Sequence, residues 1–250
     1  MKKRLFQVSM VILTAVFSLF AQNDLQKAVD YNAQGLKQFA AGNHEAAIEL
    51  FNRAIARKND YATPYYNLGS AYYHLKQFEK AAQTLEKTIE LLPAYPEAYN
   101  RLALVYAETG EYKKAADALR RSIRLNPNDA GVFNNFGFVC IQLKKFEEAI
   151  ASLEQAKRLD SGNAETSINL TYAYAMQKRY GEALAEIQPV VEAHPNDGRA
   201  RLLLGNLYIL TRDKESALAE YRKIEAFDRE LAQQLFRAIY SDKLVFVPSK

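Results

Sequence analysis

The sequence predicts an all-α solenoid of antiparallel helix pairs, and three periodic observations carry that prediction. Alanine recurs at steps of 34 residues, at Ala47, Ala81, Ala115, Ala149, Ala183 and Ala217. Small residues follow the same step at Gly35, Gly69, Ala103, Gly137, Thr171 and Gly205. A third series consists of Tyr72, Tyr106, Cys140, Tyr174 and Tyr208. A fixed period of this size indicates a stack of similar units, each packed on its neighbours.

Residues 1–22 lie outside the period and have the pattern of an export signal. Lys2, Lys3 and Arg4 precede an apolar run over residues 5–21, which is close to the short limit of about 20 residues for a membrane-spanning helix. Ala21 is a suitable small residue before a cleavage point, whereas Leu19 is larger than such sites prefer. We therefore expect export, to a bacterial periplasm. The segment is either cleaved off or retained as an inner-membrane anchor.

Charge and cysteine content narrow the choice of partners. The net charge of +4 includes Lys2, Lys3 and Arg4, and the rest of the chain carries 30 basic against 29 acidic residues. That balance argues against a nucleic-acid partner, which favours a clustered basic excess. Cys140 is the single cysteine, so no intramolecular disulfide can form, and we expect it to be a small buried apolar residue.

Six units of two amphipathic helices follow from the apolar spacing of three and four residues. The predicted units are residues 28–61, 62–95, 96–129, 130–163, 164–197 and 198–231. Pro64 and Pro96 suit the first turn of a helix, because a proline there loses no hydrogen bond. The turns within the pairs are expected at Gly42-Asn43, Lys76-Gln77, Gly110-Glu111, Lys144-Lys145, Lys178-Arg179 and Arg212-Asp213.

The order of these residues within each unit resembles the motif of a known protein family. The order aromatic, Leu-Gly, Tyr, Ala, bulky residue, Pro resembles the tetratricopeptide repeat over residues 28–231. In the second unit these positions hold Tyr65, Leu68-Gly69, Tyr72, Ala81, Leu85 and Pro93. The resemblance implies a right-handed superhelix in which the first helix of each pair lines a concave face. Family members bind extended peptides or partner helices there.

After the array, residues 230–241 carry Leu231, Leu235 and Ile239 at a spacing of four. They predict a capping helix that covers the last apolar face. The tail, residues 242–250, is apolar and β-prone from Leu244 to Val247. We expect it to pack back on the array, with a docking strand as the alternative.

No group of residues predicts catalysis, a cofactor or a metal site. His44, His74 and His194 occupy three different positions of their repeats, so no two share a helix face with metal-ligand spacing. The sequence lacks the metalloprotease, phosphate-loop and nucleophile-elbow motifs. We therefore predict a protein that is not an enzyme.

The resemblance instead implies a peptide-binding face. Asn67, Asn135 and Asn169 share one register, which means that they occupy the same position of the second, fourth and fifth repeats. Arg101 holds that position in the third repeat. Asparagine offers a donor and an acceptor to the backbone of an extended peptide, although it could also simply cap or solvate a helix face. Apolar anchors are needed as well, because hydrogen bonds of about 0.5–1.5 kcal/mol each must first offset the ordering of the peptide. The predicted binding residues are Asn67, Arg101, Asn135, Asn169, Tyr66, Tyr73, His74, Asn100, Asn134, Phe138 and Tyr172. Further side chains in lining positions are Asn32, Glu108, Gln142, Met176, Arg199 and Asn206.

The expected function is a non-enzymatic scaffold that binds a protein or peptide segment in the concave groove of a cell-envelope assembly. A carboxylate clamp is disfavoured, because Glu97 stands where that clamp needs a basic residue. The alternative is a self-associating assembly subunit, a homo-oligomer joined through its end helices and tail.

Overall fold

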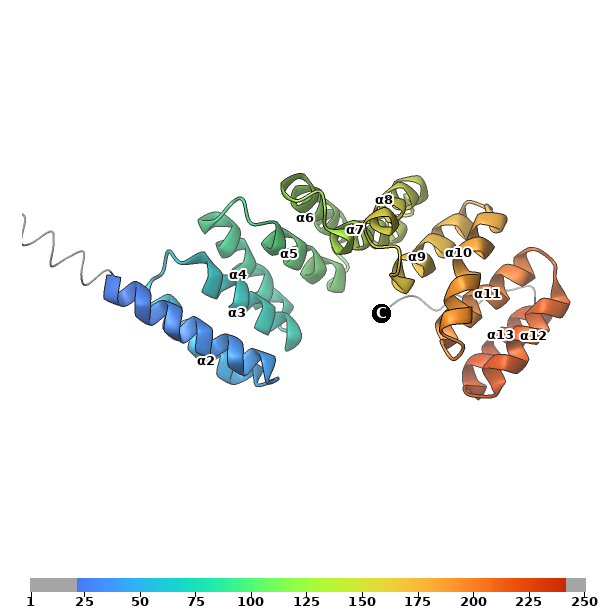
Figure 1. Cartoon of the computed structure of the whole chain (residues 1–250), viewed down its shortest axis with the longest axis horizontal. Helices are drawn as coiled ribbons and strands as arrows, with labels where there is room; N and C mark the ends of the chain where they lie inside the picture. Colours follow the sequence, from blue (N-terminus) through green and yellow to red (C-terminus); the bar gives the residue numbers. More distant parts are fainter. Residues whose placement is uncertain (1–21, 242–250) are drawn as a thin grey trace, which may run out of the picture. The chain divides into compact units, whose positions relative to one another are not determined.

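The computed structural model describes residues 22–241, which form helices joined by short turns with no strand among them (Figure 1). The chain separates into two compact units, Met1–Leu125 and Asn126–Lys250. The predicted fold class, an all-α solenoid of helix pairs closed by a capping helix, is confirmed. The predicted export signal over residues 1–22 lies outside the described residues except for Gln22, and the tail, residues 242–250, lies outside them entirely.

The first unit consists of three helix pairs. A helix over residues 22–40 is followed by α2 (His44–Arg57), α3 (Ala62–His74), α4 (Phe78–Leu91), α5 (Pro96–Glu108) and α6 (Tyr112–Leu125). Each helix packs chiefly against the next one along the chain, and α3 also contacts α5. The first helices of successive pairs therefore lie side by side.

The second unit repeats this arrangement and adds one helix. Its elements are α7 (Ala130–Gln142), α8 (Phe146–Leu159), α9 (Ala164–Met176), α10 (Tyr180–Ala193), α11 (Gly198–Leu210), α12 (Lys214–Glu225) and α13 (Arg229–Ser241). The first helices α7, α9 and α11 contact one another in order, and α13 packs on both α11 and α12. α3, α5, α7, α9 and α11 begin at the first residues of the second to sixth repeats.

All six turns within the pairs fall where the sequence predicts them. At the turn after α3, Lys76 has a φ of 56°, Gln77 N donates to Tyr72 O at 2.9 Å, and Lys76 N donates to Tyr73 O at 2.9 Å. This is the Schellman pattern, which satisfies the last helical carbonyls through one residue in the left-handed region. Equivalent residues with positive φ are Gly42, Gly110, Lys144, Lys178 and Arg212.

The core explains the periodic residues. All six alanines of the 34-residue series have no exposed surface. The glycines of the small-residue series each face a bulky side chain, Gly35 facing Phe51, Gly69 facing Leu85 and Gly137 facing Leu153. A Cβ on Gly69, for example, would lie 2.7 Å from Leu85 Cγ. These residues allow the paired helices to approach closely, and Cys140 is buried in the same core as predicted.

The last pair departs from this pattern. Tyr221 stands where the earlier second helices have Leu85 or its equivalents, and it is only partly buried. Leu235 of α13 takes the space against Gly205, where a Cβ would lie 2.6 Å from Leu235 Cδ2. α13 therefore supplies a core residue as well as a cover. Phe236 and Tyr240 lie beside Tyr221 and Lys214 of α12 and remain 42% and 58% exposed.

Candidate functional site

The second unit contains a hollow of about 340 Å³ on the face formed by α7, α9 and α11. Its apolar wall comes mainly from Phe138, Ile141, Ile168, Tyr172, Leu202 and Leu203. Phe146 and Met176 complete that wall, and the polar groups on it are Gln142, Lys144, Asn169, Arg199 and Asn206. A concave, mostly apolar surface with a few polar groups is the usual character of a ligand site.

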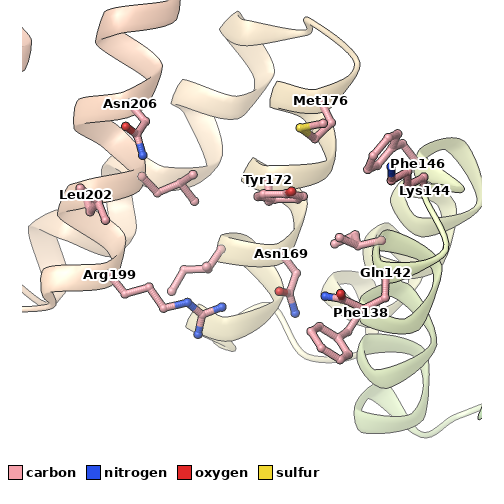
Figure 2. Close-up of a pocket in the computed structure, with 13 residues that line it drawn as sticks. Phe138, Gln142, Lys144, Phe146, Asn169, Tyr172, Met176, Arg199, Leu202 and Asn206 are labelled. Atoms are coloured by element: carbon pink, nitrogen blue, oxygen red, sulfur yellow. The ribbon is translucent and has the colours of Figure 1, made fainter. Parts of the chain in front are cut away.

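Tyr172 stands in the middle of this hollow, on α9 (Figure 2). Phe138 and Gln142 of α7 lie to one side of it, and Arg199 and Leu202 of α11 lie to the other. Burial raises the pKa of the Tyr172 phenol above its ordinary value. Its hydroxyl therefore stays neutral near pH 7 and can act as both hydrogen-bond donor and acceptor.

Met176 forms part of the rim, one helical turn after Tyr172 (Figure 2). Its side chain is 41% exposed, although most large apolar residues of α9 are buried. An exposed methionine at a hollow is typical of an adaptable binding surface, because its thioether side chain is flexible and polarizable.

Two cations line the hollow, and only one has a carboxylate partner. Arg199 forms a bidentate pair with Glu165, with Nη1–Oε2 and Nη2–Oε1 distances of 2.9 and 3.0 Å. Lys144 lies at the turn after α7, is exposed, and makes no ion pair with any residue that the structure describes. The charge of Arg199 is therefore largely compensated, and Lys144 gives the wall its net positive charge.

Local capping orients the three helices that build this face. The side chains of Asp129, Asn163 and Asp197 accept hydrogen bonds from the backbone N–H groups of Val132, Thr166 and Ala200, respectively. Such caps satisfy donors at the first turn that the helix itself cannot pair. The carboxyl ends of the helices, next to Lys144, lie at the opposite edge of the face.

Three of the predicted binding residues, Phe138, Asn169 and Tyr172, come together in the hollow. Asn134 lies beside them, because its Oδ1 accepts from Asn169 Nδ2 at 3.2 Å and from Thr166 Oγ1 at 3.2 Å. Asn135, the next residue on α7, does not belong to the wall of the hollow.

The other predicted residues lie on α3 and α5 of the first unit. Asn67 Nδ2 donates to Asn32 Oδ1 at 2.8 Å, and both side chains are buried. The Tyr66 ring packs on Tyr95, with centroids 5.0 Å apart. Asn100 is half-buried on α5.

Tyr73, His74 and Arg101 form a separate cluster in the first unit. The Arg101 guanidinium lies 5.6 Å from the Tyr73 ring centroid, and Tyr73 OH donates to Glu108 Oε1 at 3.4 Å. The His74 ring stacks on His44 with centroids 5.2 Å apart. Burial, followed by the neighbouring His44 and Arg101, lowers the pKa of His74.

The sequence did not identify several residues of the hollow. Ile141, Ile168, Leu202 and Leu203 look like ordinary core positions in the repeat, and Phe146 belongs to a second helix. Lys144 did carry a signal, because the residue at this turn is also basic at Lys76, Lys178 and Arg212.

Neither a metal-binding cluster nor a membrane-spanning helix occurs among the described residues. Within residues 22–241, no three histidine, cysteine, aspartate or glutamate side chains gather in a way that could hold a metal ion. None of the helices in that range is both long and apolar enough to cross a bilayer.

Comparison with protein families gives one match that spans most of the chain. Residues 19–234 match the tetratricopeptide-repeat family model described as the C-terminal domain of cilia and flagella-associated protein 70. No curated protein sequence matches the chain.

Solved structures with a similar fold are numerous. PilF of Pseudomonas aeruginosa is 20% identical with a TM-score of 0.75, and the match covers 86% of this chain and 99% of that one. YrrB, a tetratricopeptide-repeat protein with an unusual peptide-binding site, is 25% identical with a TM-score of 0.65, covering 75% of this chain and 97% of its own. MamA of Desulfovibrio magneticus is 20% identical with a TM-score of 0.63, covering 68% of this chain and 97% of its own.

Proposed function

Because the chain belongs to the tetratricopeptide-repeat family, we propose that it is a non-enzymatic scaffold that binds an extended segment of a partner protein on its first-helix face. The observation that carries this proposal is the hollow on α7, α9 and α11, where an apolar wall surrounds Tyr172 and Asn169. Ile141, Ile168, Leu202 and Leu203 form the buried base of the hollow, whereas Tyr172 and Met176 keep accessible apolar surface on it. The peptide-binding site of the similar protein YrrB supports the same function.

The chemistry of the hollow suits a side chain from a peptide. Aromatic residues such as Tyr172 and Phe138 supply most of the binding energy at protein interfaces. Asn169 can hydrogen-bond to a peptide backbone through the donor and acceptor capacity that Asn134 does not use. The partner then gains apolar burial from the hollow and orientation from the amide.

We also propose that the protein works in the bacterial cell envelope. The basic residues Lys2, Lys3 and Arg4 before the apolar run over residues 5–21 support export to the periplasm. Cleavage after Ala21 releases the array, whereas retention of the run tethers it to the inner membrane. N-terminal sequencing of the protein purified from the periplasmic and inner-membrane fractions distinguishes the two fates, and a cytoplasmic protein with an intact Met1 would contradict export.

A random peptide array probed with the purified protein tests the binding proposal. Wild-type protein is expected to bind a subset of the peptides, and Tyr172→Ala is expected to lose that binding. Tyr180→Ala is the matched control, since Tyr180 is half-buried like Tyr172 but lies on the second helix α10, outside the wall of the hollow, and it should bind like wild type. Circular dichroism of all three proteins checks that the helices are intact. Equal binding by Tyr172→Ala and wild type would refute the assignment to this hollow.

A second candidate function, self-association, is favoured by the exposed rings on the last helix. Phe236 and Tyr240 pack on each other with centroids 4.7 Å apart and remain 42% and 58% exposed. Light scattering over a concentration series, with wild type and a Phe236→Ser, Tyr240→Ser variant, measures whether these rings join copies. A mass equal to that of the monomer at every concentration would exclude this function.

A further inference from the structure

The charges around the hollow point to a more specific ligand than an unspecified peptide. Of the two cations in its wall, Arg199 is engaged by both oxygens of Glu165. Lys144 has no carboxylate partner among residues 22–241, and its side chain lies at the edge of the hollow near Phe146 (Figure 2). Among residues 22–241, no acidic residue lines the hollow. A carboxylate on a bound ligand would therefore meet an uncompensated positive charge.

The carboxylates near this edge make their contacts with residues other than Lys144. Glu148 pairs with Lys145 at 3.5 Å, and Glu147 accepts a hydrogen bond from Gln177 Nε2 at 2.7 Å. At the next turn, Glu182 is paired with Arg179. These acids belong to the second helices α8 and α10, so they leave the positive charge of Lys144 available on the first-helix face.

The backbone at Lys144 provides a second argument. Its φ of 58° lies in the left-handed region, which glycine adopts readily and a lysine adopts only at a cost. Glycine holds this position at Gly42 and Gly110, and a basic residue holds it at Lys76, Lys178 and Arg212; of these residues, Lys144 is the one in the wall of the hollow. A cation here also interacts favourably with the carboxyl end of α7, but that effect alone does not place the charge in the wall of a hollow.

The opposite edge of the face carries the opposite charge. Asp129 and Asp197, which have no cation partner among residues 22–241, cap the amino ends of α7 and α11, whereas Glu165 of α9 is compensated by Arg199. A ligand with an acidic group is therefore repelled from that edge and attracted to the edge at Lys144. This asymmetry fixes the side of the hollow on which the charged part of the ligand lies.

Building on the proposed function, we propose that the hollow recognises a peptide segment in which an aromatic side chain is adjacent to an acidic residue. The aromatic ring enters the apolar wall around Tyr172 and Met176, and the neighbouring carboxylate pairs with Lys144. Aromatic groups fit hollows of this size, and the flexible Met176 adapts the rim to the ring.

Tryptophan fluorescence offers a direct test, because the chain contains no tryptophan and indole emission arises only from an added peptide. The probes are short blocked peptides, each with a single tryptophan flanked by aspartates, by lysines or by serines. For wild-type protein, the aspartate peptide should show a blue-shifted emission that saturates, with an affinity about tenfold above that of the lysine peptide at low salt. Added salt should narrow this difference.

Lys144→Gly is the decisive variant, because it removes the charge and at the same time relieves the left-handed backbone. It should weaken binding of the aspartate peptide by about threefold to tenfold while the protein stays at least as stable as wild type. Lys76→Gly is the matched control, since Lys76 occupies the same turn of another repeat with a φ of 56°, and its affinity should be unchanged. Lys144→Glu should reverse the preference between the aspartate and lysine peptides.

The outcomes separate this inference from the proposed function. If the hollow binds array peptides but the aspartate peptide has no advantage, or if Lys144→Gly has no effect, the charge preference is wrong and the scaffold function stands. If an aspartate-flanked peptide with alanine in place of the tryptophan competes as strongly as the aspartate peptide with tryptophan, the aromatic requirement is wrong. If no peptide binds in the array or in solution, the proposed function fails and this inference fails with it.

Discussion

Arg201 and Glu220 form a buried ion pair at two positions of the sixth repeat where the second repeat has a different contact. Their side chains are 10% and 4% exposed, and Arg201 Nη1 lies 2.7 Å from Glu220 Oε2. Arg201 Nε also donates to Pro195 O. In the second repeat the same two positions hold Tyr65 and Thr84, and Tyr65 OH donates to the equivalent carbonyl, Asn59 O, at 3.1 Å.

Removing one member of this pair should destabilise the second unit strongly. Glu220→Ala leaves the Arg201 guanidinium buried beside an apolar group, and such a change typically costs about 3–5 kcal/mol. Lys223, which donates to Glu220 Oε1 at 2.6 Å, is 55% exposed and can turn to water without a comparable penalty. At about 2–4 °C per kcal/mol for a chain of this size, the melting temperature falls by roughly 6–20 °C.

Replacing both members should cost far less than replacing one. The double variant Arg201→Tyr, Glu220→Thr installs the residues of the second repeat, including a hydroxyl that can donate to Pro195 O. Substitution of a complete buried ion pair is often neutral or stabilising, so we expect stability within about 1 kcal/mol of wild type.

Urea unfolding followed by circular dichroism measures all three proteins. Since the chain has two compact units, a two-transition fit assigns the change to the second unit. A Glu220→Ala loss below about 1 kcal/mol, or a double variant no better than the single one, would refute the claim that the pair is energetically coupled.

Three further predictions concern stability. Lys76→Gly should raise the free energy of unfolding by up to about 1 kcal/mol, because it removes left-handed strain, and a decrease in a urea titration would contradict this. Gly69→Ala should lower the free energy of unfolding by about 1–3 kcal/mol, because its Cβ would lie 2.7 Å from Leu85. Gly181→Ala is the control, because its Cβ would have no atom within 4 Å, and it should be neutral or stabilising in the same titration. Burial raises the pKa of Tyr95 to about 12; its protonated form is therefore favoured on folding, and stability should fall as the pH rises from about 10 to about 12. Tyr95→Phe should flatten that slope in unfolding measurements across this range, and an unchanged slope would count against it.

The turns were predictable from the sequence because their geometry is local. A Schellman turn needs one residue in the left-handed region and a hydrogen-bonded frame of six residues, and the period places Lys76 and its equivalents in that frame. The helix starts at Pro96 and Ala130 follow from the same local signals. The core alanines could also be predicted from the sequence, because an alanine repeated at every 34th residue indicates close contact between paired helices.

The hollow and the buried ion pair were harder to predict, for different reasons. The hollow combines a first helix, a turn and a second helix through Tyr172, Lys144 and Phe146, and no single period connects these positions. Arg201 and Glu220 each break the repeat pattern, 19 residues apart. Two such departures facing each other in the repeat are a signal of contact, but only once the repeat has been aligned on itself.

The hydrogen bonds within the asparagine register limit how much these residues can contribute to peptide binding. Asn67 and Asn169 are 8% and 4% exposed, and each uses its amide to donate to an asparagine on the preceding first helix. One amide N–H and the carbonyl oxygen remain on each, and every hydrogen bond they could form with a peptide contributes only about 0.5–1.5 kcal/mol net. Burial of about 150–250 Å² of an aromatic ring, at about 25 cal/mol per Å², contributes about 4–6 kcal/mol before ordering costs. The register therefore joins neighbouring repeats and can orient a peptide, while the affinity of the proposed complex must come mainly from the hollow around Tyr172.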